Sequence, residues 1–473
     1  MAQHKRQAVV IMHGMGEQIP MQTLNGFAKA VWGEDRTLID RDRPDSVTGG
    51  PRTDNPMWSK PDPRNNSFEL RRLTTEESSS GYKTDFYEYY WAHLMHGTTL
   101  EQVQSWVMGL LFRNPFTRVP AQVMLAWVAL WIVTIGIGWA LIDSVMAERG
   151  PDTPLGRLVQ ALFALVVGWF VTNILVRRFG DVARYVTARP PNVARRQEIR
   201  EKGVQLLERL IRDERAGKPT YDRIVVVAHS LGTIVAYDIL THTWARMNDE
   251  LPVGRGGMAQ PARAKVEHMA ASALGLPLAA GADATPWDIA SFQAAQADAL
   301  AELRGQGHPW PISDFVTMGA PLTHAEFLMA EDMQDLRARQ ASRELPTCPP
   351  VMEFDRKSGL FHVGYRAGAI AKKGTGAAAE DPRIPHHAAL FAYTRWSNLY
   401  SPSALILKGD IISGPVGAQF GLAQGDKIAS GIHDIAVLTT GWVTHNNYWK
   451  LGAGPAPDHI LKLRAALRLN GQD

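Results

Sequence analysis

The sequence predicts an α/β fold built on a mostly parallel sheet, with an inserted apolar hairpin and lid-like insertions. Short runs rich in β-branched residues read as buried strands at 8–12, 224–227 and 314–318. Helical patterns lie between these strands, and strands that alternate with helices form parallel sheets. The chain of 473 residues has room for one large core or for two domains.

Composition excludes several classes of function. The formal net charge of +3 is too small to indicate nucleic-acid binding. The single cysteine, Cys348, allows no intrachain disulfide, as is typical of a reducing compartment. His386 and His387 with Asp381 read as a solvated loop rather than as metal ligands, so we expect neither a metal nor a cofactor. The apolar run 8–12 is too short for a signal peptide, so we expect a cytoplasmic N-terminus.

The first predicted strand, 8–12, ends in His13-Gly14-Met15-Gly16. Glycines let a backbone come close to a ligand. In hydrolases with a nucleophile elbow, a loop of this kind supplies a backbone N–H to the oxyanion hole. We therefore expect His13 and Gly14 to line a substrate site. The alternative is a glycine-rich turn without chemistry.

The next stretch supplies a helix and two strands. Residues 17–32 read as a helix, and the polar stretch 40–67, rich in Pro, Gly and Asp, reads as an exposed loop. Alternating apolar residues predict strands at 68–73 and 84–91.

Two long apolar segments, 119–142 and 158–176, contain no charged residue. As helices they would be about 36 and 28 Å long, against about 30 Å of hydrocarbon. We expect a transmembrane helical hairpin; the alternative is a buried core hairpin or a lid on a membrane surface. Two such helices predict a multi-pass membrane protein. Basic residues concentrate on the two flanks of the hairpin, which predicts that the soluble part lies on the cytoplasmic side.

Residues 192–215 read as an amphipathic helix that leads to the strand 224–227. Ala228-His229-Ser230-Leu231-Gly232 follows this strand and opens an apolar-periodic helix. A strand, a tight turn with a central serine, and a helix form the context that a nucleophile elbow needs.

The elbow assigns roles to its residues. The sharp turn needs small residues two positions before and after the serine, and Ala228 and Gly232 meet that need. It lifts the Ser230 hydroxyl above the sheet edge, and the N–H of Leu231 at the helix start can bind an oxyanion. His229 should diverge from the nucleophile and border the substrate. The alternative is an ordinary turn in which Ser230 caps the helix.

The rest of the chain adds helices at 288–304 and 458–469 and strands at 391–400 and 435–438. Residues 250–286 read as a loop or lid, and residues 331–386 as mostly irregular. The predicted organisation is an N-terminal part of the α/β domain at 1–99, a membrane insertion at 100–191, and the remainder of the domain at 192–473, with insertions near 250–310 and 331–386.

A serine nucleophile needs a base, and the base needs an acid that orients it. In an elbow-type sheet the chain order is serine, acid, histidine. His445 follows the strand 435–438 by one short loop, and Asp410 lies between the strand 391–400 and His445. Less suitable positions, before a strand or in an ordinary turn, are those of His386, His387, His433, Asp381, Asp426 and Asp434.

Five segments together resemble the lipase-like α/β-hydrolase superfamily: HGMG, AHSLG, FVTMGAPL, RWSNLY with GDIISGPV, and THNNYW. The closest likeness is to its membrane-associated lipase and acyl-inositol-deacylase-like branch. There, a Trp-x-Asn strand precedes the acid and a His-x-x-Tyr-Trp segment supplies the base. This sequence departs from the pattern at Ala228, where glycine is commoner, and in the 401–409 segment ahead of the acid.

The resemblance implies an α/β-hydrolase fold and acyl transfer. Ser230 would attack an ester carbonyl, His445 would act as general base and Asp410 would orient it. The N–H groups of Leu231 and Met15 would bind the oxyanion.

We therefore expect a membrane-anchored serine ester hydrolase of the lipase or phospholipase type, whose substrate is a lipid or another acyl ester. One alternative is a thioesterase, amidase or acyltransferase with the same triad. Another is a catalytically inactive membrane scaffold, in which His445 would lie far from Ser230.

Overall fold

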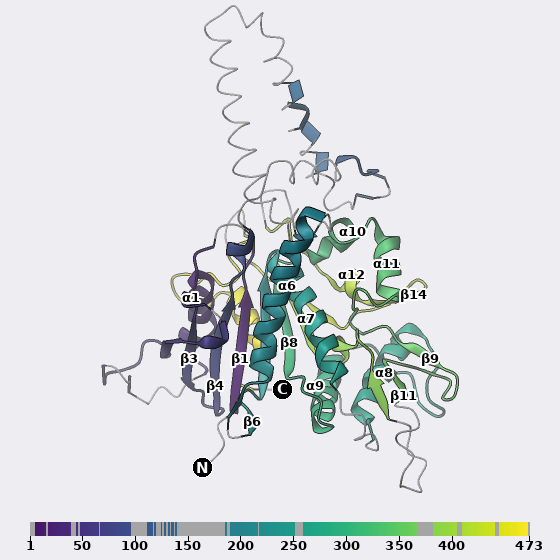
Figure 1. Ribbon diagram of the computed structural model, residues 1–473, viewed down its shortest axis with the longest axis horizontal. Coiled ribbons are helices and arrows are strands. Elements are labelled where there is room, and N and C mark those ends of the chain that lie inside the picture. Colours follow the sequence, from purple (N-terminus) through teal and green to yellow (C-terminus); the bar gives the residue numbers. More distant parts are fainter. Residues whose placement is uncertain are drawn as a thin grey trace, which may run out of the picture.

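A single sheet of eight strands forms the centre of the chain (Figure 1). The computed structural model describes residues 5–15, 18–38, 44–45, 48–65, 67–95, 111–116, 118–119, isolated positions between 124 and 139, 185–186, 190–215, 217–250, 259–366, 382–403, 409–439 and 444–471. The strand order is β16-β13-β8-β7-β1-β4-β3-β2. All pairs from β16 to β4 are parallel, whereas β3 is antiparallel to β4 and to β2. The prediction of an α/β fold with a mostly parallel sheet is confirmed.

The strands of this sheet are β1 (Lys5–Met12), β2 (Met57–Pro61), β3 (Arg71–Glu77), β4 (Tyr82–Tyr89), β7 (Arg223–His229), β8 (Ile312–Met318), β13 (Arg395–Tyr400) and β16 (Ile432–Ala436). The α-helices are α1 (Gln22–Ala28), α6 (Pro190–Ile211), α7 (Gly232–Asp249), α8 (Pro261–Leu274), α9 (Ile289–Gly305), α10 (Ala325–Leu328), α11 (Met333–Ala341), α12 (Gly417–Phe420) and α13 (Asp458–Leu467). Short strand pairs are β5 (Glu214–Arg215) with β6 (Lys218–Pro219), β9 (Glu353–Asp355) with β10 (Leu360–His362), β11 (Gly364–Arg366) with β12 (Arg383–Pro385), and β14 (Leu422–Gln424) with β15 (Lys427–Ala429). Single turns are η1 (Lys29–Gly33), η2 (Pro63–Asn65), η3 (Ala92–Met95), η6 (Pro321–His324) and η8 (Leu390–Ala392).

Strand β7 occupies the middle of the sheet, and all of its residues are buried. Its valines alternate between two cores, with Val226 facing one and Val225 and Val227 the other. Since both faces are covered, a continuous apolar run is favoured over alternation. Arg223, the first residue of β7, is buried because its Nη2 lies 2.6 Å from Asp314 Oδ2 on β8.

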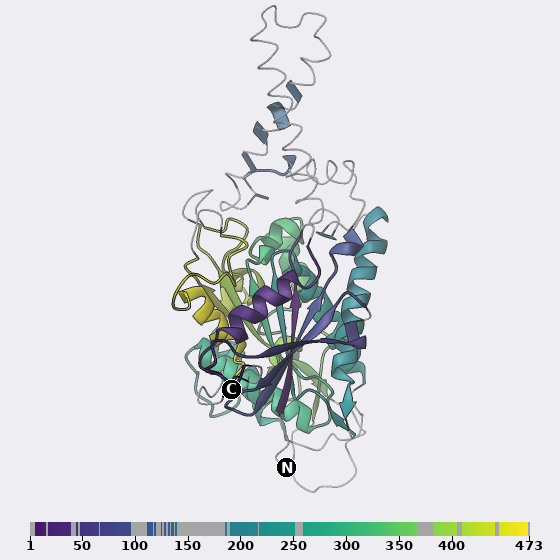
Figure 2. The same ribbon diagram turned by 90° about the vertical axis from the view of Figure 1, so that its left-hand side faces the viewer.

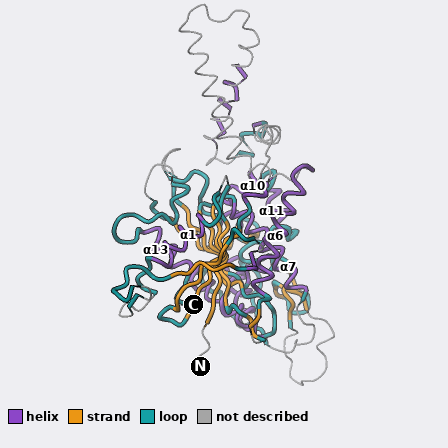
Figure 3. Tube along the Cα trace, turned by 60° about the vertical axis from the view of Figure 1, so that its left-hand side comes forward, coloured by secondary structure: helices purple, strands orange, loops and turns teal. Residues whose placement is uncertain are grey.

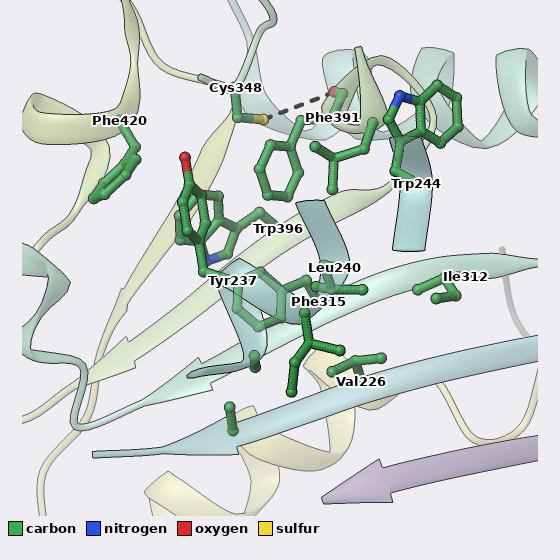
Figure 4. Packing of buried hydrophobic residues seen from close by; sticks show 14 of the residues in the cluster. Val226, Tyr237, Leu240, Trp244, Ile312, Phe315, Cys348, Phe391, Trp396 and Phe420 are labelled. Atoms are coloured by element: carbon green, nitrogen blue, oxygen red, sulfur yellow. Dashed lines mark hydrogen bonds between the residues drawn. The ribbon is translucent and has the colours of Figure 1, made fainter. Parts of the chain in front are cut away.

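Helices cover both faces of the sheet. Figure 3 shows α1 and α13 on one side of the strands and α6 and α7 on the other, and Figure 2 shows α1 and α13 from their own side. The larger core lies between the sheet and the layer of α6 to α9. In it, Tyr237 of α7 packs beside Phe391 and Trp396, whose rings stack with centroids 4.8 Å apart (Figure 4).

The strand order reverses at β1. The chain runs from β1 through β2 and β3 to β4 on one side of β1, and then returns to β7 on the other side. In open parallel sheets, ligands bind beyond the carboxyl ends of the strands at such a switch point. Met12 of β1 and Ala228 of β7 are register partners, so the loops that follow these two strands emerge side by side.

The prediction of a two-helix, multi-pass membrane protein is contradicted. A transmembrane helix needs about 20 consecutive, mostly apolar residues. Within the part of the chain that the structure describes, no helix combines the length and the apolar character needed to cross a bilayer. The predicted segment 158–176, and most of 119–142, lie outside the described residues.

Three other expectations differ from the structure. Residues 261–274, expected in a loop or lid, form helix α8, which packs on α9 and contributes Val266 and Met269 to the larger core. Strand β2 lies within the expected loop 40–67 as an exposed edge strand. The last strand covers 432–436 rather than 435–438, so His433 lies within it.

Candidate active site

Ser230 stands on a strained turn between β7 and α7. Its φ angle of 54° lies in the left-handed region, which non-glycine residues rarely adopt. The Ser230 N–H donates to Met318 O on β8, at 3.0 Å, and this bond holds the turn against the sheet. A Cβ on Gly232 would lie 2.3 Å from His13 O, so this position must be glycine. The predicted elbow geometry is therefore present.

The structure brings Ser230, His445 and Asp410 together. Ser230 Oγ lies 2.7 Å from His445 Nε2, and His445 Nδ1 lies 3.0 Å from both carboxylate oxygens of Asp410. Asp410 follows β13 and His445 follows β16, as the chain order predicted. The Ser230 and Asp410 residues are buried, and the His445 side chain is 13% exposed. These distances are those of a nucleophile, a base and an orienting acid.

The charge on Asp410 fixes the direction of both hydrogen bonds. Burial alone would raise the pKa of this carboxyl, but hydrogen bonds from His445, Tyr448 and Ser413 outweigh burial and lower the pKa to about 2. An ionised Asp410 only accepts hydrogen bonds, so His445 carries its proton on Nδ1. The Nε2 lone pair then faces the Ser230 hydroxyl, which donates to it.

Tyr448 completes the support of Asp410. Its hydroxyl donates to Asp410 Oδ2 at 2.8 Å and accepts the N–H of Ser401 at 3.1 Å. The ring is fully buried. The sequence analysis gave Tyr448 no role of its own and mentioned only the His-x-x-Tyr-Trp segment that contains it. Its position three residues after His445 is the feature of the sequence that could have indicated this contact.

Gly319, at the end of β8, is a second residue without a predicted role. Its φ is 59°, and a Cβ there would lie 2.9 Å from the Tyr448 ring and 3.2 Å from Asp410 Oδ2. A side chain at this position would therefore push the acid or Tyr448 out of place. The Gly-Ala-Pro that follows the predicted strand 314–318 was the signal in the sequence.

The loop after β1 lies against the nucleophile. A Cβ on Gly14 would stand 2.8 Å from Ser230 Cβ and 3.3 Å from Ser230 Oγ, so glycine permits this approach. Met15 is the next residue and packs against the larger core. Leu231 precedes the first turn of α7, where backbone N–H groups have no acceptor within the helix. The assignment of Leu231 and Met15 as oxyanion donors stays a prediction.

His13, predicted to line the substrate site, is buried and makes backbone contacts with both ring nitrogens. Nδ1–H donates to Gly14 O at 2.7 Å, and Nε2 accepts the N–H of Trp91 at 3.1 Å. Burial lowers the pKa of His13 to about 4, so the ring stays neutral. These contacts fix the Gly14 loop to the end of β4.

His229, also predicted to border the substrate, diverges from Ser230 and supports the base. Its Nε2–H donates to the backbone oxygen of His445 at 2.7 Å, and its ring packs edge-on against Trp449. Burial and the neighbouring His445 lower the pKa of His229 to about 3, so it too stays neutral.

Helix α10 carries the described residues of a segment from before the predicted hairpin. Phe327 of α10 packs with Val119, and the Arg113 guanidinium lies 4.7 Å from the Phe327 ring centroid, so residues 113 and 119 lie on α10. Helix α10 directly follows η6, whose His324 contacts Ile411 O next to the acid. Phe112 and Phe116 of this segment are 70% and 94% exposed.

This arrangement supports nucleophilic acyl transfer. Among the residues that the structure describes, no group of histidine, cysteine and carboxylate side chains has the geometry to hold a metal ion.

Comparison with models of known families, with curated proteins and with solved structures gave no match.

Proposed function

We propose that the protein is a serine hydrolase that cleaves acyl esters. The observation that carries this proposal is the continuous hydrogen-bonded line from Ser230 Oγ through His445 to Asp410, with distances of 2.7 and 3.0 Å. In an inactive scaffold of this fold, His445 would lie far from Ser230. The short distance therefore supports the enzyme over the scaffold.

The proposed reaction has two steps. Ser230 Oγ attacks the ester carbonyl while its proton passes to His445 Nε2, and the ionised Asp410 stabilises the imidazolium that forms. His445 then protonates the leaving alcohol, and an acyl-enzyme remains. A water molecule, deprotonated by His445, hydrolyses the acyl-enzyme and restores Ser230. The N–H groups of Leu231 and Met15 would bind the oxyanion, and one such donor contributes about 3 kcal/mol to transition-state stabilisation.

We also propose the α/β-hydrolase fold for the sheet, with the likeness to the lipase-like branch as its motivation. Three features support it. The nucleophile follows the central parallel strand on a turn with positive φ, the glycine loop follows the neighbouring β1, and the acid and base follow β13 and β16 in that order.

An apolar acyl donor, such as a lipid ester, is the substrate class that the surroundings favour. Contiguous exposed apolar surface marks contact with apolar ligands or surfaces, and three exposed apolar residues motivate the proposal. Ile19, which follows the Gly14 loop, is 66% exposed, and Phe112 and Phe116 lie on the segment packed against α10. A series of 4-nitrophenyl esters of increasing acyl length tests this class, and we expect kcat/KM to rise with chain length.

The test of the nucleophile is covalent labelling with an alkyl fluorophosphonate. We expect the label on the tryptic peptide 224–246, which contains Ser230, and in Ser230→Ala we expect ester turnover to disappear together with the label on this peptide. Ser342→Ala, which removes an exposed serine whose hydroxyl donates to Arg339 O, is the matched control and should change neither. An unsubstituted protein that is folded but leaves peptide 224–246 unlabelled would overturn the proposal.

A further inference from the structure

A second serine is hydrogen-bonded to a histidine and a carboxylate outside the Ser230 site. Ser358 lies in the turn between β9 and β10, and its Oγ is 3.0 Å from His362 Nε2. His362 Nδ1 is 2.8 Å from Glu267 Oε2 on α8. Figure 1 shows α8 and β9 to the right of α7 and α9.

The contacts of Glu267 fix the direction of these hydrogen bonds. The carboxylate is buried, accepts the N–H of Val363 at 2.9 Å and pairs with Arg263 Nη1 at 2.5 Å. Burial alone would raise the pKa of Glu267, but the hydrogen bond from His362 and the charge of Arg263 outweigh it and lower the pKa. An ionised Glu267 accepts the proton on His362 Nδ1, so Nε2 is the nitrogen that faces the Ser358 hydroxyl.

Ser358 is exposed, whereas His362 and Glu267 are buried. A reagent in solution therefore reaches the hydroxyl while the base behind it stays fixed. The turn offers no oxyanion donor from its next two residues, because the Gly359 N–H donates to Asp355 O at 2.8 Å and the Leu360 N–H to Ser358 Oγ at 3.4 Å.

We propose that Ser358 is a second activated serine, which accepts an acyl or phosphonyl group from a small activated ester and retains it. Ser358 Oγ forms a bond to the carbonyl carbon or to phosphorus, and the bond to the leaving phenolate or fluoride breaks. The serine proton passes to His362 Nε2 and from there to water or to the leaving group. Without an oxyanion hole the adduct hydrolyses slowly, so Ser358 reacts about once per molecule rather than turning over.

The two serines are separable by peptide mapping. Trypsin cleaves after Lys357 and Arg366, so Ser358 lies in peptide 358–366, apart from the 224–246 peptide of Ser230. The full-length Ser230→Ala protein is incubated with 4-nitrophenyl acetate or with a fluorophosphonate, and adducts are quantified on each peptide by mass spectrometry. A missing adduct on peptide 224–246 of the unsubstituted protein would count against the proposed function. A missing adduct on peptide 358–366 would count against this inference.

Exposed Ser342, which has no imidazole partner among its described contacts, is the internal reference. A positioned general base contributes about 10²–10⁴ to rate, so we expect an adduct on Ser358 about 100 times faster than on Ser342. In His362→Gln the Ser358 rate should fall to that of Ser342, and in Ser358→Ala, which changes only an exposed turn, peptide 358–366 should carry no adduct. A Ser358 rate equal to that of Ser342, or one that His362→Gln leaves unchanged in a folded protein, would overturn the inference.

Discussion

Removing the hydroxyl of Tyr448 tests how Asp410 is positioned. Tyr448→Phe removes this hydroxyl without changing the buried ring. The hydroxyl donates to Asp410 Oδ2 at 2.8 Å and accepts the Ser401 N–H. A hydrogen bond to a charged group contributes about 1.5–3 kcal/mol. At about 1.4 kcal/mol per factor of ten, its loss limits the catalytic effect to roughly 10- to 100-fold.

We expect kcat for a 4-nitrophenyl ester to fall roughly 10- to 100-fold in Tyr448→Phe, with KM unchanged within a factor of two. The reason is that, in the proposed mechanism, Asp410 orients the base and does not contact the substrate. The free energy of unfolding should also fall by about 1–3 kcal/mol, because the buried Ser401 N–H loses its acceptor.

Tyr237→Phe is the matched control. Its hydroxyl is equally buried and donates to Pro346 O at 2.7 Å, without contact to the candidate triad. The two variants should lose similar stability, measured by urea unfolding, but Tyr237→Phe should keep its kcat. If both variants show the same kcat, or if Tyr448→Phe changes KM alone, the reasoning about the Tyr448–Asp410 contact is wrong.

Three further predictions follow from the same contacts. Asp410→Asn should lower kcat about 10⁴-fold, because an amide that donates to Nδ1 selects the wrong tautomer of His445. A kcat within tenfold of the unsubstituted protein would contradict the role of Asp410 as the orienting acid. In the folded protein the pKa of Asp410 is about 2, against an ordinary 3.8, so its ionisation adds about 2 kcal/mol of stability above pH 4. This stability is lost as the pH falls toward 2. Urea unfolding between neutral pH and about pH 3 should therefore show a smaller loss of stability in Asp410→Asn than in the unsubstituted protein. Gly232→Ala should destabilise the fold by several kcal/mol, since its Cβ would lie 2.3 Å from His13 O, whereas Gly305→Ala, which meets open space, should melt at or above the original temperature.

The parts of the site that the sequence predicted are those that depend on local order. A strand, a turn with small flanking residues and a helix specify the backbone at Ser230 without reference to the rest of the chain. The order of Ser230, Asp410 and His445 along a parallel sheet then limits which residues reach the same edge. Tyr448 could not be assigned in this way, because its contact with Asp410 depends on the packing of two loops that are distant in the sequence.

The errors have equally physical causes. Helix α8 was expected to be a loop, although Pro261 at its first position and the left-handed Gly275 after its last are ordinary helix boundaries. Strand β2 has no alternating apolar pattern because it is an exposed edge strand, and its conformation depends on pairing with β3. Sequence periodicity reports burial, so it fails where most side chains of a strand are exposed and the strand is held mainly by its backbone pairing.

The sheet positions the candidate site, because backbone hydrogen bonds continue from its strands into the turns at Ser230 and Gly319. The Ser230 N–H donates to Met318 O, and the Gly319 N–H donates to Leu399 O. These bonds tie the nucleophile turn to β8 and the glycine beside the acid to β13. His445 is held differently, by the side chain of His229 on its backbone oxygen. The position of His445 therefore depends on two side chains, His229 at its backbone and Asp410 at its ring, whereas the turn of Ser230 is tied directly to the backbone of β8.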